Sequence, residues 1–478
     1  MTNPSAGDAA PRGDRALADT LASMRAAHLR DPVPDWATRA KRLRILQALM
    51  LDNREPIAAA IDADFGHRPR EETDILEFFP SLSGVHHALR HGQNWMRTRR
   101  RWANFWFLPA RTELRPQPLG VVGIIAPWNY PLYLAIGPLT DALAAGNRVM
   151  VKMSEFTPRF SALFAQIVAR SFRDDEVSVV NGGADVGRAF ASLPFDHLLF
   201  TGSTAVGREV MASAAPNLTP VTLELGGKSP ALIGPGARFG HAVERIVLGK
   251  LLNAGQTCIA PDYVLLPRSL VRPFVEAARV AATRFYPGLP LNAQYSSVIS
   301  DRHYTRLRAL RDDAVAMDAK AHALGVAVDD ANARTISPVL LTDVDDRMQV
   351  MREELFGPLL PLVPYDTLDE AIDYVAARPH PLALYVFEDD RATLDRILER
   401  TQAGGVTVND TILHIAQHNL PFGGVGASGM GSYHGEAGFR TFSRIKPIMR
   451  QTRINAASLL NPPYGKSFAQ LLKLLLRR

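Results

Sequence analysis

The chain has 478 residues, more than one hydrophobic core usually organises, so we expect at least two domains. Hydrophobic residues make up 47% of the chain and charged residues 21%, a balance that excludes disordered and fibrous proteins. No stretch approaches the roughly 20 apolar residues of a membrane-spanning helix. The net charge of +6 is compatible with an anionic partner, but no recognition helix, RNA-binding motif or zinc spacing accompanies it. We therefore expect no binding of nucleic acid.

The first part of the chain predicts helices and then a hairpin. Apolar residues recur at helical spacing over residues 15–100, for instance at Leu43, Leu46 and Met50. Residues 105–120 carry prolines between β-type residues, which is typical of an edge hairpin. An exposed β edge tends to pair with another chain, so this hairpin is a candidate contact between subunits.

Two α/β stretches follow. In residues 121–223, β-type runs alternate with helical segments, which predicts a parallel sheet wound with helices and a place for a dinucleotide. The expected strands cover residues 121–125, 148–152, 177–180 and 197–200, and the expected helices cover residues 132–145 and 159–172. A second α/β stretch spans residues 224–419, so we expect the active site in the cleft between the two.

Cys258, the only cysteine of the chain, lies in the second stretch, within Asn-Ala-Gly-Gln-Thr-Cys-Ile-Ala-Pro at residues 253–261. A lone thiol forms no internal disulfide and builds no thiolate metal site, which leaves a buried spectator or a nucleophile. Buried spectators are the commoner case. Two further segments favour the nucleophile.

Each of these segments places a polar side chain at the end of an apolar run. Glu224 precedes Leu-Gly-Gly, and burial there would raise the pKa of its carboxyl toward the range that a general base needs. Asn129 lies in a Pro-Trp-Asn-Tyr-Pro turn, and its side-chain N–H can donate to a developing oxyanion. A thiol, a base and an oxyanion donor together predict thioacyl chemistry.

These segments, in this order, strongly resemble the aldehyde dehydrogenase superfamily. The resemblance runs from about residue 94 to residue 475. It includes Phe-Thr-Gly-Ser at 200–203, Glu-Glu-Leu-Phe-Gly-Pro at 353–358 and Leu-Pro-Phe-Gly-Gly-Val-Gly at 420–426. The resemblance implies an α/β fold with a Rossmann-like NAD-binding domain.

Other strings indicate the branch of the superfamily. Gly-Met-Gly-Ser-Tyr-His-Gly at 429–435 and Pro-Asp-Tyr at 261–263 look most like the class 3 and fatty-aldehyde branch. Val-Asn-Asp-Thr at 408–411, with Ala-Gln at 416–417, is similar to bacterial coniferyl aldehyde dehydrogenases. The implied substrate is an aromatic aldehyde such as coniferaldehyde, or an aliphatic aldehyde of medium or long chain. The implied assembly is a homodimer, with a tetramer second.

The resemblance also assigns domains and roles. It implies an NAD-binding domain at residues 1–104 and 123–223, a catalytic domain at 224–419, and an oligomerisation hairpin and tail strand at 105–122 and 440–460. In the implied reaction the thiolate of Cys258 attacks the aldehyde, Asn129 stabilises the oxyanion, and Glu224 activates the water that hydrolyses the thioester. Glu354 is the alternative base.

The cofactor site departs from the usual dinucleotide fingerprint. A strand-to-helix turn can hold a pyrophosphate on the free N–H groups of the helix, and in this superfamily such a turn replaces the fingerprint. The turn comprises Gly202, Ser203, Thr204, Ala205, Val206 and Gly207. Lys152 and Glu155 match the residues that hold the adenosine ribose, and Glu354 and Phe356 match those at the nicotinamide ribose and ring. A carboxylate at Glu155 favours NAD over NADP, although relatives in this branch accept both.

Three alternatives accompany this interpretation. In a CoA-acylating dehydrogenase, CoA would resolve the thioester, but that branch generally lacks a carboxylate at the position of Glu224. An inactive family member kept as a binding or structural protein is disfavoured by the intact Cys258, Glu224 and Asn129. The third alternative, a basic nucleic-acid-binding module, lacks any motif.

Partners and location complete the expectations. His87 and His91 stand four residues apart, as do His414 and His418, but neither pair encloses the glutamate of a His-Glu-x-x-His site, so no metal is expected. The apolar end of the chain, residues 468–478, is too short to span a bilayer. It would dock on a neighbouring subunit or lie on a membrane surface as a peripheral contact. A polar N-terminus without a secretory signal and a single thiol predict a cytoplasmic protein.

Overall fold

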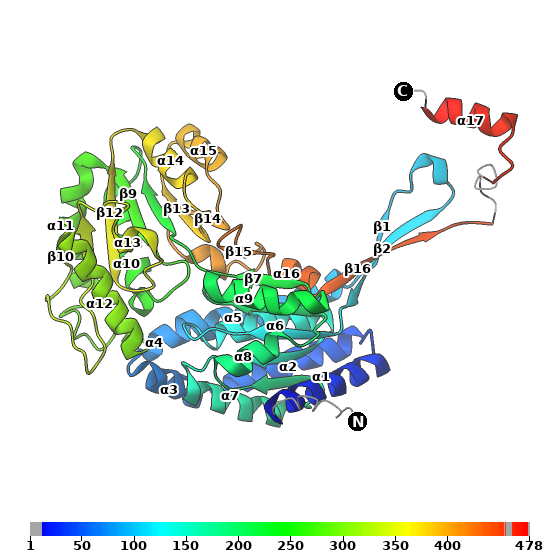
Figure 1. Ribbon diagram of the computed structural model, residues 1–478, viewed down its shortest axis with the longest axis horizontal. Coiled ribbons are helices and arrows are strands. Elements are labelled where there is room, and N and C mark those ends of the chain that lie inside the picture. Colours follow the sequence, from blue (N-terminus) through cyan, green and yellow to red (C-terminus); the bar gives the residue numbers. More distant parts are fainter. Residues whose placement is uncertain (1–11, 454, 456–460, 477–478) are drawn as a thin grey trace, which may run out of the picture.

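The computed structural model describes residues 12–453, 455 and 461–476. It contains two α/β sheets, each covered by helices, and a long arm that projects away from both (Figure 1). The first sheet has six strands in the order β15-β7-β6-β3-β4-β5, all parallel except β15. Its strands are β3 (Val121–Ile125), β4 (Arg148–Lys152), β5 (Val177–Val180), β6 (His197–Thr201), β7 (Val221–Glu224) and β15 (Gly429–Met430).

The first sheet is buried on both faces, as apolar runs in parallel strands require. On β3, Val122 and Ile124 face one hydrophobic cluster, whereas Val121 and Ile125 face another. The first cluster is completed by α2 (Trp36–Asp52), α5 (Phe79–Trp95), α6 (Tyr133–Ala145) and α7 (Pro158–Ser171), and the second by α1 (Arg12–Arg30), α8 (Ala184–Ala191) and α9 (Thr204–Ala214). The strand order reverses at β3, whose neighbours are β4 and β6, and such a switch point usually lies at a ligand site.

The second sheet has seven strands in the order β10-β11-β12-β9-β8-β13-β14. They are β8 (Pro230–Ile233), β9 (Tyr263–Pro267), β10 (Lys320–Ala323), β11 (Val339–Thr342), β12 (Leu359–Tyr365), β13 (Ala383–Phe387) and β14 (Gly405–Val408). The accompanying helices are α10 (Phe239–Leu251), α11 (Val271–Phe285), α12 (Asp301–Ala316), α13 (Gln349–Arg352), α14 (Leu368–Ala376) and α15 (Arg391–Arg400). The two α/β stretches predicted from the sequence therefore form two separate sheets.

The arm is a three-stranded antiparallel sheet in the order β1-β2-β16. The hairpin expected at residues 105–120 has its strands at β1 (Arg99–Arg101) and β2 (Arg111–Pro118), and the short helix Phe105–Phe107 lies between them. The tail strand expected at residues 440–460 is β16 (Ser443–Arg450), while residues 454 and 456–460 of that range lie outside the described residues. The arm leaves the two edges formed by β1 and β16 without a neighbouring strand among the described residues.

The remaining helices lie before the first sheet and at the end of the chain. They are α3 (Arg54–Phe65), α4 (Arg70–Thr73), a π-helix (Asp74–Phe78), α16 (Gly435–Thr441) and α17 (Lys466–Leu476). In Figure 1, α17 lies beyond the tip of the arm, far from both sheets, and it buries no residue. Residues 477 and 478 of the predicted apolar tail lie outside the described residues. Among the described helices, none has the length and apolar character needed to cross a membrane.

Candidate active site

The loop that carries Cys258 has an unusual backbone. A short helical turn, Leu252–Gly255, follows α10, and Asn253 and Ala254 have left-handed φ values of 52° and 51° within it. Non-glycine residues in this conformation store strain of roughly 1–3 kcal/mol each, and such strain clusters at active sites. Gly255 has φ 76°, and a Cβ there would lie 2.4 Å from the backbone oxygen of Gly357. The loop that carries Cys258 therefore packs closely against the segment that contains Gly357.

Asn129 lies directly against the thiol loop. Its side chain is buried, and Nδ2 donates to the backbone oxygen of Gln256 at 3.2 Å. Gln256 precedes Cys258 by two residues. An amide nitrogen carries two hydrogens, so one N–H of Asn129 remains for an oxyanion near the sulfur.

Glu224 is buried near the thiol, and Glu354 lies near it with intermediate exposure. Glu224 ends β7, neither of its carboxyl oxygens has a hydrogen-bond partner in the described part of the chain, and burial raises its pKa well above the ordinary value. Burial and the charge of Asp262 raise the pKa of Glu354 to about 8. Burial, and then the charges of Glu354 and Glu224, raise the pKa of the Cys258 thiol to about 12. Both candidate bases therefore act on the thiol electrostatically, and Glu354 does so more strongly.

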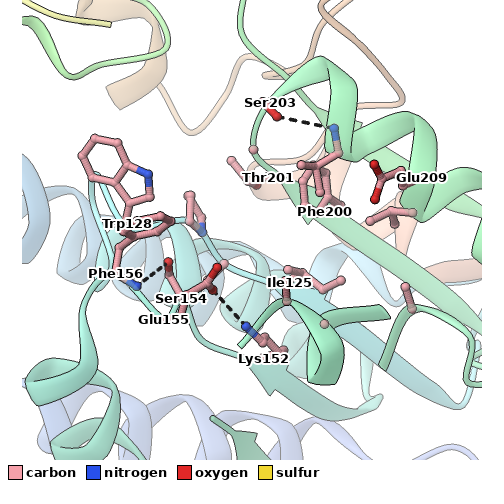
Figure 2. A pocket seen from close by; sticks show the side chains of 18 of the residues that line it. Ile125, Trp128, Lys152, Ser154, Glu155, Phe156, Phe200, Thr201, Ser203 and Glu209 are labelled. Carbon is pink, nitrogen blue, oxygen red and sulfur yellow. Dashed lines mark hydrogen bonds and ion pairs between the residues drawn. The ribbon is translucent and has the colours of Figure 1, made fainter. Parts of the chain in front are cut away.

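A cavity of about 440 Å³ lies at the carboxyl ends of β3, β4 and β6 (Figure 2). On one side Ser203 caps α9, because its Oγ accepts the backbone N–H of Val206 at 3.4 Å. On the other side Nζ of Lys152 lies 3.3 Å from Oε2 of Glu155. Figure 2 shows these two groups on opposite walls, with the ring of Trp128 at one end.

Two glycines of the predicted turn lie so close to neighbouring side chains that a Cβ would not fit. A Cβ at Gly202 would lie 2.5 Å from the ring of Phe200, and a Cβ at Gly207 would lie 2.6 Å from the side chain of Leu225. Gly207 therefore lets the start of α9 pack against the end of the first sheet. Gly202, Ser203 and Val206 line the cavity, whereas Ala205 does not. The free N–H groups of a capped helix, the ion pair opposite and the cavity volume suit a dinucleotide.

Glu354 and Phe356 approach from the second sheet. Glu354 lines a neighbouring cavity of about 630 Å³ together with Thr204 and Gly226. A Cβ at Gly226 would lie 2.1 Å from a carboxyl oxygen of Glu354, so only glycine allows this contact. The ring of Phe356 meets that of Trp128 edge-on, with 5.3 Å between the ring centroids.

Three residues that the sequence does not mark reach the cavity of about 440 Å³ from α12. Arg302, His303 and Arg306 line it, and the ring of His303 lies 5.1 Å from that of Trp128. Arg306 also donates to the backbone oxygens of Glu354 and Leu355. Nothing in the local sequence marks these residues, because only the folded chain brings α12 to the first sheet.

The histidines gather beside the site. The rings of His87 and His91 lie 4.6 Å apart, and His418 lies 5.8 Å from His87 and 5.8 Å from His434. Nδ1 of His414 is hydrogen-bonded to Thr407. Among the described residues, no group of three acidic, histidine or cysteine side chains is arranged to hold a metal ion.

Known proteins match this chain over nearly its whole length. The family model described as the aldehyde dehydrogenase family matches residues 10–448. A probable coniferyl aldehyde dehydrogenase of Pseudomonas aeruginosa is 51% identical over 451 residues, which cover 94% of each chain. Aldehyde dehydrogenase family 3 member A2 of Macaca fascicularis is 39% identical, over 90% of this chain and 87% of that protein.

Solved structures agree. Staphylococcus aureus AldH in its substrate-bound state gives a TM-score of 0.91 at 35% identity, covering 96% of this chain and 99% of that chain. Mycobacterium tuberculosis aldehyde dehydrogenase complexed with NAD+ gives 0.81 at 29% identity, covering 91% and 90%. The predicted superfamily, its branch and the α/β fold are thereby confirmed. The chain belongs to the aldehyde dehydrogenase family.

Proposed function

We propose that this chain oxidises an aldehyde to the carboxylic acid with NAD, through a thioester on the sulfur of Cys258. The observation that carries the proposal is the position of the only thiol, which lies in the loop contacted by Asn129 and is influenced by the carboxylates of Glu224 and Glu354. The NAD+ complex of the Mycobacterium tuberculosis relative supports the choice of cofactor.

The reaction begins at the thiol. Because its pKa is raised to about 12, Cys258 holds its proton at neutral pH and needs a base. Glu224 takes this proton, the sulfur bonds to the carbonyl carbon, and the free N–H of Asn129 donates to the oxygen that becomes negative. NAD held in the cavity would supply the acceptor for the hydride that leaves the former aldehyde carbon, and a thioester would remain on Cys258.

Hydrolysis regenerates the enzyme. Glu224 first releases to solvent the proton that it took from the thiol. A water molecule then loses a proton to Glu224, and the water oxygen bonds to the thioester carbon. The carbon–sulfur bond then breaks, the carboxylic acid leaves, and a proton returns to the sulfur of Cys258. Glu354 is the second candidate for this base, because its carboxyl also influences the thiol.

The cofactor residues divide between the two halves of the dinucleotide. Lys152 and Glu155 hold the adenosine ribose, and Glu354 and Phe356 hold the nicotinamide ribose and ring. The pyrophosphate binds at the start of α9, at Gly202, Ser203, Thr204, Ala205, Val206 and Gly207. NADP is also accepted, because Glu155 is partly exposed and its side chain can turn away from a 2′-phosphate.

The domains follow from these roles. Residues 1–104 and 123–223 bind NAD, residues 224–419 supply the thiol, and residues 105–122 and 440–460 join two subunits as a homodimer. Docking of α17 on the neighbouring subunit, or its peripheral contact with a membrane, would cover its exposed apolar side chains. A single cysteine suits a reducing compartment, and the location that we propose is the cytoplasm.

The substrate that we propose is coniferaldehyde or a related aromatic aldehyde. The name of the Pseudomonas aeruginosa relative supports it. So do aromatic side chains beside the site: the hydroxyl of Tyr130 is hydrogen-bonded to Thr257, next to the thiol, and the ring of Phe422 stacks on His414 and His434. An aliphatic aldehyde of medium or long chain is the alternative.

One assay tests these proposals together. NADH absorbance is followed after coniferaldehyde, benzaldehyde, hexanal or decanal is added with NAD, and kcat/KM is compared. We expect NADH without added CoA, and the highest kcat/KM with coniferaldehyde. Product that appeared only with CoA would contradict the hydrolytic step, and no NADH with any aldehyde would contradict the activity.

A further inference from the structure

The segment between α3 and α5 carries three charged side chains almost wholly inside the protein. Arg68 is 1% exposed, Glu72 6% and Glu77 0%. Charged groups are rarely buried unless they are paired, and breaking one buried pair destabilises strongly. None of the three belongs to the catalytic or cofactor residues proposed above, so their burial requires a separate explanation.

Arg68 and Glu77 are hydrogen-bonded to the backbone of the turn that carries Asn129. Nη1 of Arg68 donates to the backbone oxygen of Asn129 at 3.1 Å and to Oε1 of Glu77 at 2.8 Å. Oε2 of Glu77 accepts the backbone N–H groups of Leu132 at 2.7 Å and Tyr133 at 3.2 Å. The turn is therefore held at the oxyanion donor itself and again where α6 begins.

Glu72 is hydrogen-bonded to the backbone of the loop that carries Cys258. Its carboxylate accepts the backbone N–H of Asn253, at 3.0 Å to Oε1 and 3.2 Å to Oε2, and the hydroxyl of Ser296 at 2.6 Å. Nδ2 of Asn253 lies 3.2 Å from the backbone oxygens of both Asn129 and Gln256. The backbone oxygen of Asn129 thus receives one N–H from Arg68 and one from the thiol loop.

The π-helix explains how one segment reaches both loops. In a regular α-helix of 3.6 residues per turn, residues five positions apart face different sides. A π-turn adds one residue to the turn, and such insertions are frequent at functional sites. The π-helix Asp74–Phe78 therefore turns Glu77 to the buried side on which Glu72 already lies.

We infer that Arg68, Glu72 and Glu77 are positioning residues that fix the distance between the amide of Asn129 and the thiol of Cys258. This inference rests on the proposed function, in which those two groups act on one carbonyl. The three side chains hold the backbone of both loops at four N–H or C=O groups around the site. A displacement of about 1 Å at a reacting centre can lower the rate about 100-fold.

A double-mutant cycle on the full chain tests the inference. The rate of NADH formation is measured in a single turnover with NAD and a substrate aldehyde. Asn129→Ala is expected to lower this rate about 100- to 1,000-fold, and Arg68→Met to lower it roughly 10- to 100-fold. Because Arg68 acts through Asn129, adding Arg68→Met to Asn129→Ala should lower the rate by less than about threefold further.

A matched variant separates positioning from folding. Arg42 forms another buried pair, with its Nε 3.0 Å from Oε1 of Glu176, and it touches neither loop. Arg42→Met is expected to lower the melting temperature as Arg68→Met does, but to leave the single-turnover rate within about twofold. The dissociation constant of NAD should stay unchanged in both.

Each outcome is decisive. Effects of Arg68→Met and Asn129→Ala that multiply, or a wild-type rate in Arg68→Met, would overturn the inference. A wild-type rate in Asn129→Ala would instead contradict the oxyanion role in the proposed function. If Arg68→Met yields no folded protein, Glu77→Gln replaces it in the cycle, because the amide has nearly the same volume but only one acceptor oxygen for the two that hold Arg68 and the N–H groups of Leu132 and Tyr133.

Discussion

At the scale of single residues, burial acts on the thiol and on both candidate bases in the same direction. It raises the pKa of Cys258, Glu224 and Glu354, so the ionised carboxylate of either glutamate is a stronger base than in water. A buried carboxyl without a hydrogen-bond partner costs roughly 1–3 kcal/mol, and a native protein rarely retains one without a use. Glu224 is such a carboxyl within the described part of the chain, which supports its role as the base.

The thiol of Cys258 belongs to the chemical step and not to the cofactor cavity. Cys258→Ala should therefore abolish NADH formation while leaving the dissociation constant of NAD nearly unchanged. Steady-state absorbance and a titration of protein fluorescence with NAD measure the two effects. More than a trace of activity in the purified variant would show that another group is the nucleophile.

In the proposed reaction, Glu224 is the base that allows hydrolysis of the thioester. Glu224→Gln keeps the shape of the side chain but removes the base, so the thioester should form and then persist. We expect a burst of NADH near one equivalent per active site, followed by a slow steady state, and mass spectrometry should find the acyl group on Cys258. Turnover at the wild-type rate would assign the base to Glu354, and a Glu354→Gln variant would then show the burst.

In the proposed site, Glu155 favours NAD over NADP. Its carboxylate lies at the wall of the cavity, 3.3 Å from Nζ of Lys152, and would repel a 2′-phosphate. Glu155→Gln should therefore lower the ratio of kcat/KM for NAD to that for NADP, by roughly tenfold for the loss of one charge repulsion near 1.4 kcal/mol. The ratio measured with one aldehyde checks this, and an unchanged ratio would remove Glu155 from the ribose site.

The sequence marks the proposed site residues that stand in continuous motifs, but not the proposed positioning residues that only the fold brings together. Cys258, Glu224 and Asn129 end or follow apolar strands, so the pattern marks them. Arg68 and Glu77 lie in a helical segment in which charged residues are ordinary, and no local signal shows that they are buried. Their partners lie 61 and 55 residues away along the chain, in the turn of Asn129.

At the scale of elements, β3, β4, β5 and β6 were predicted nearly to the residue because apolar runs mark them. The strand β15, the helix α8 and the strand β1 were not predicted. The helix α8 has eight residues with Gly187 inside, and a glycine costs about 1 kcal/mol there. The strand β1 reads Arg-Arg-Arg, which has little β propensity, and it forms because it pairs with β2.

The packing of α9 on the first sheet can be tested at Gly207. Gly207→Val would place a side chain against Leu225, push the start of α9 outward and displace the N–H groups that hold the pyrophosphate. The dissociation constant of NAD should rise at least about tenfold, while alkylation of Cys258 by iodoacetamide in the absence of NAD keeps its rate. Gly240→Val is the matched control, because a Cβ at Gly240 meets nothing within 4 Å. Equal effects of the two variants on NAD binding would contradict the role of Gly207.

At the scale of the whole molecule, the arm stands apart from the candidate site. Residues of the first sheet and of α12 line the cavity of about 440 Å³, whereas the arm carries its strands away from both sheets (Figure 1). Its two free edges and its exposed aromatic tip would favour aggregation in an isolated chain, and natural proteins usually cover such edges. Pairing of two arms would cover them without touching either active site.

We therefore expect a homodimer whose contact between subunits is formed by the arm. Trp102 is 99% exposed near the tip of the arm, and Leu218 is 88% exposed on the body of the molecule. Trp102→Asp places a charge in the proposed contact and should shift the protein toward monomers, whereas Leu218→Asp should leave the dimer intact. Light scattering at micromolar concentration measures the mass of each variant. A wild-type protein that stayed at the chain mass of 52.4 kDa would contradict the pairing of arms, and equal masses for the two variants would place the contact elsewhere.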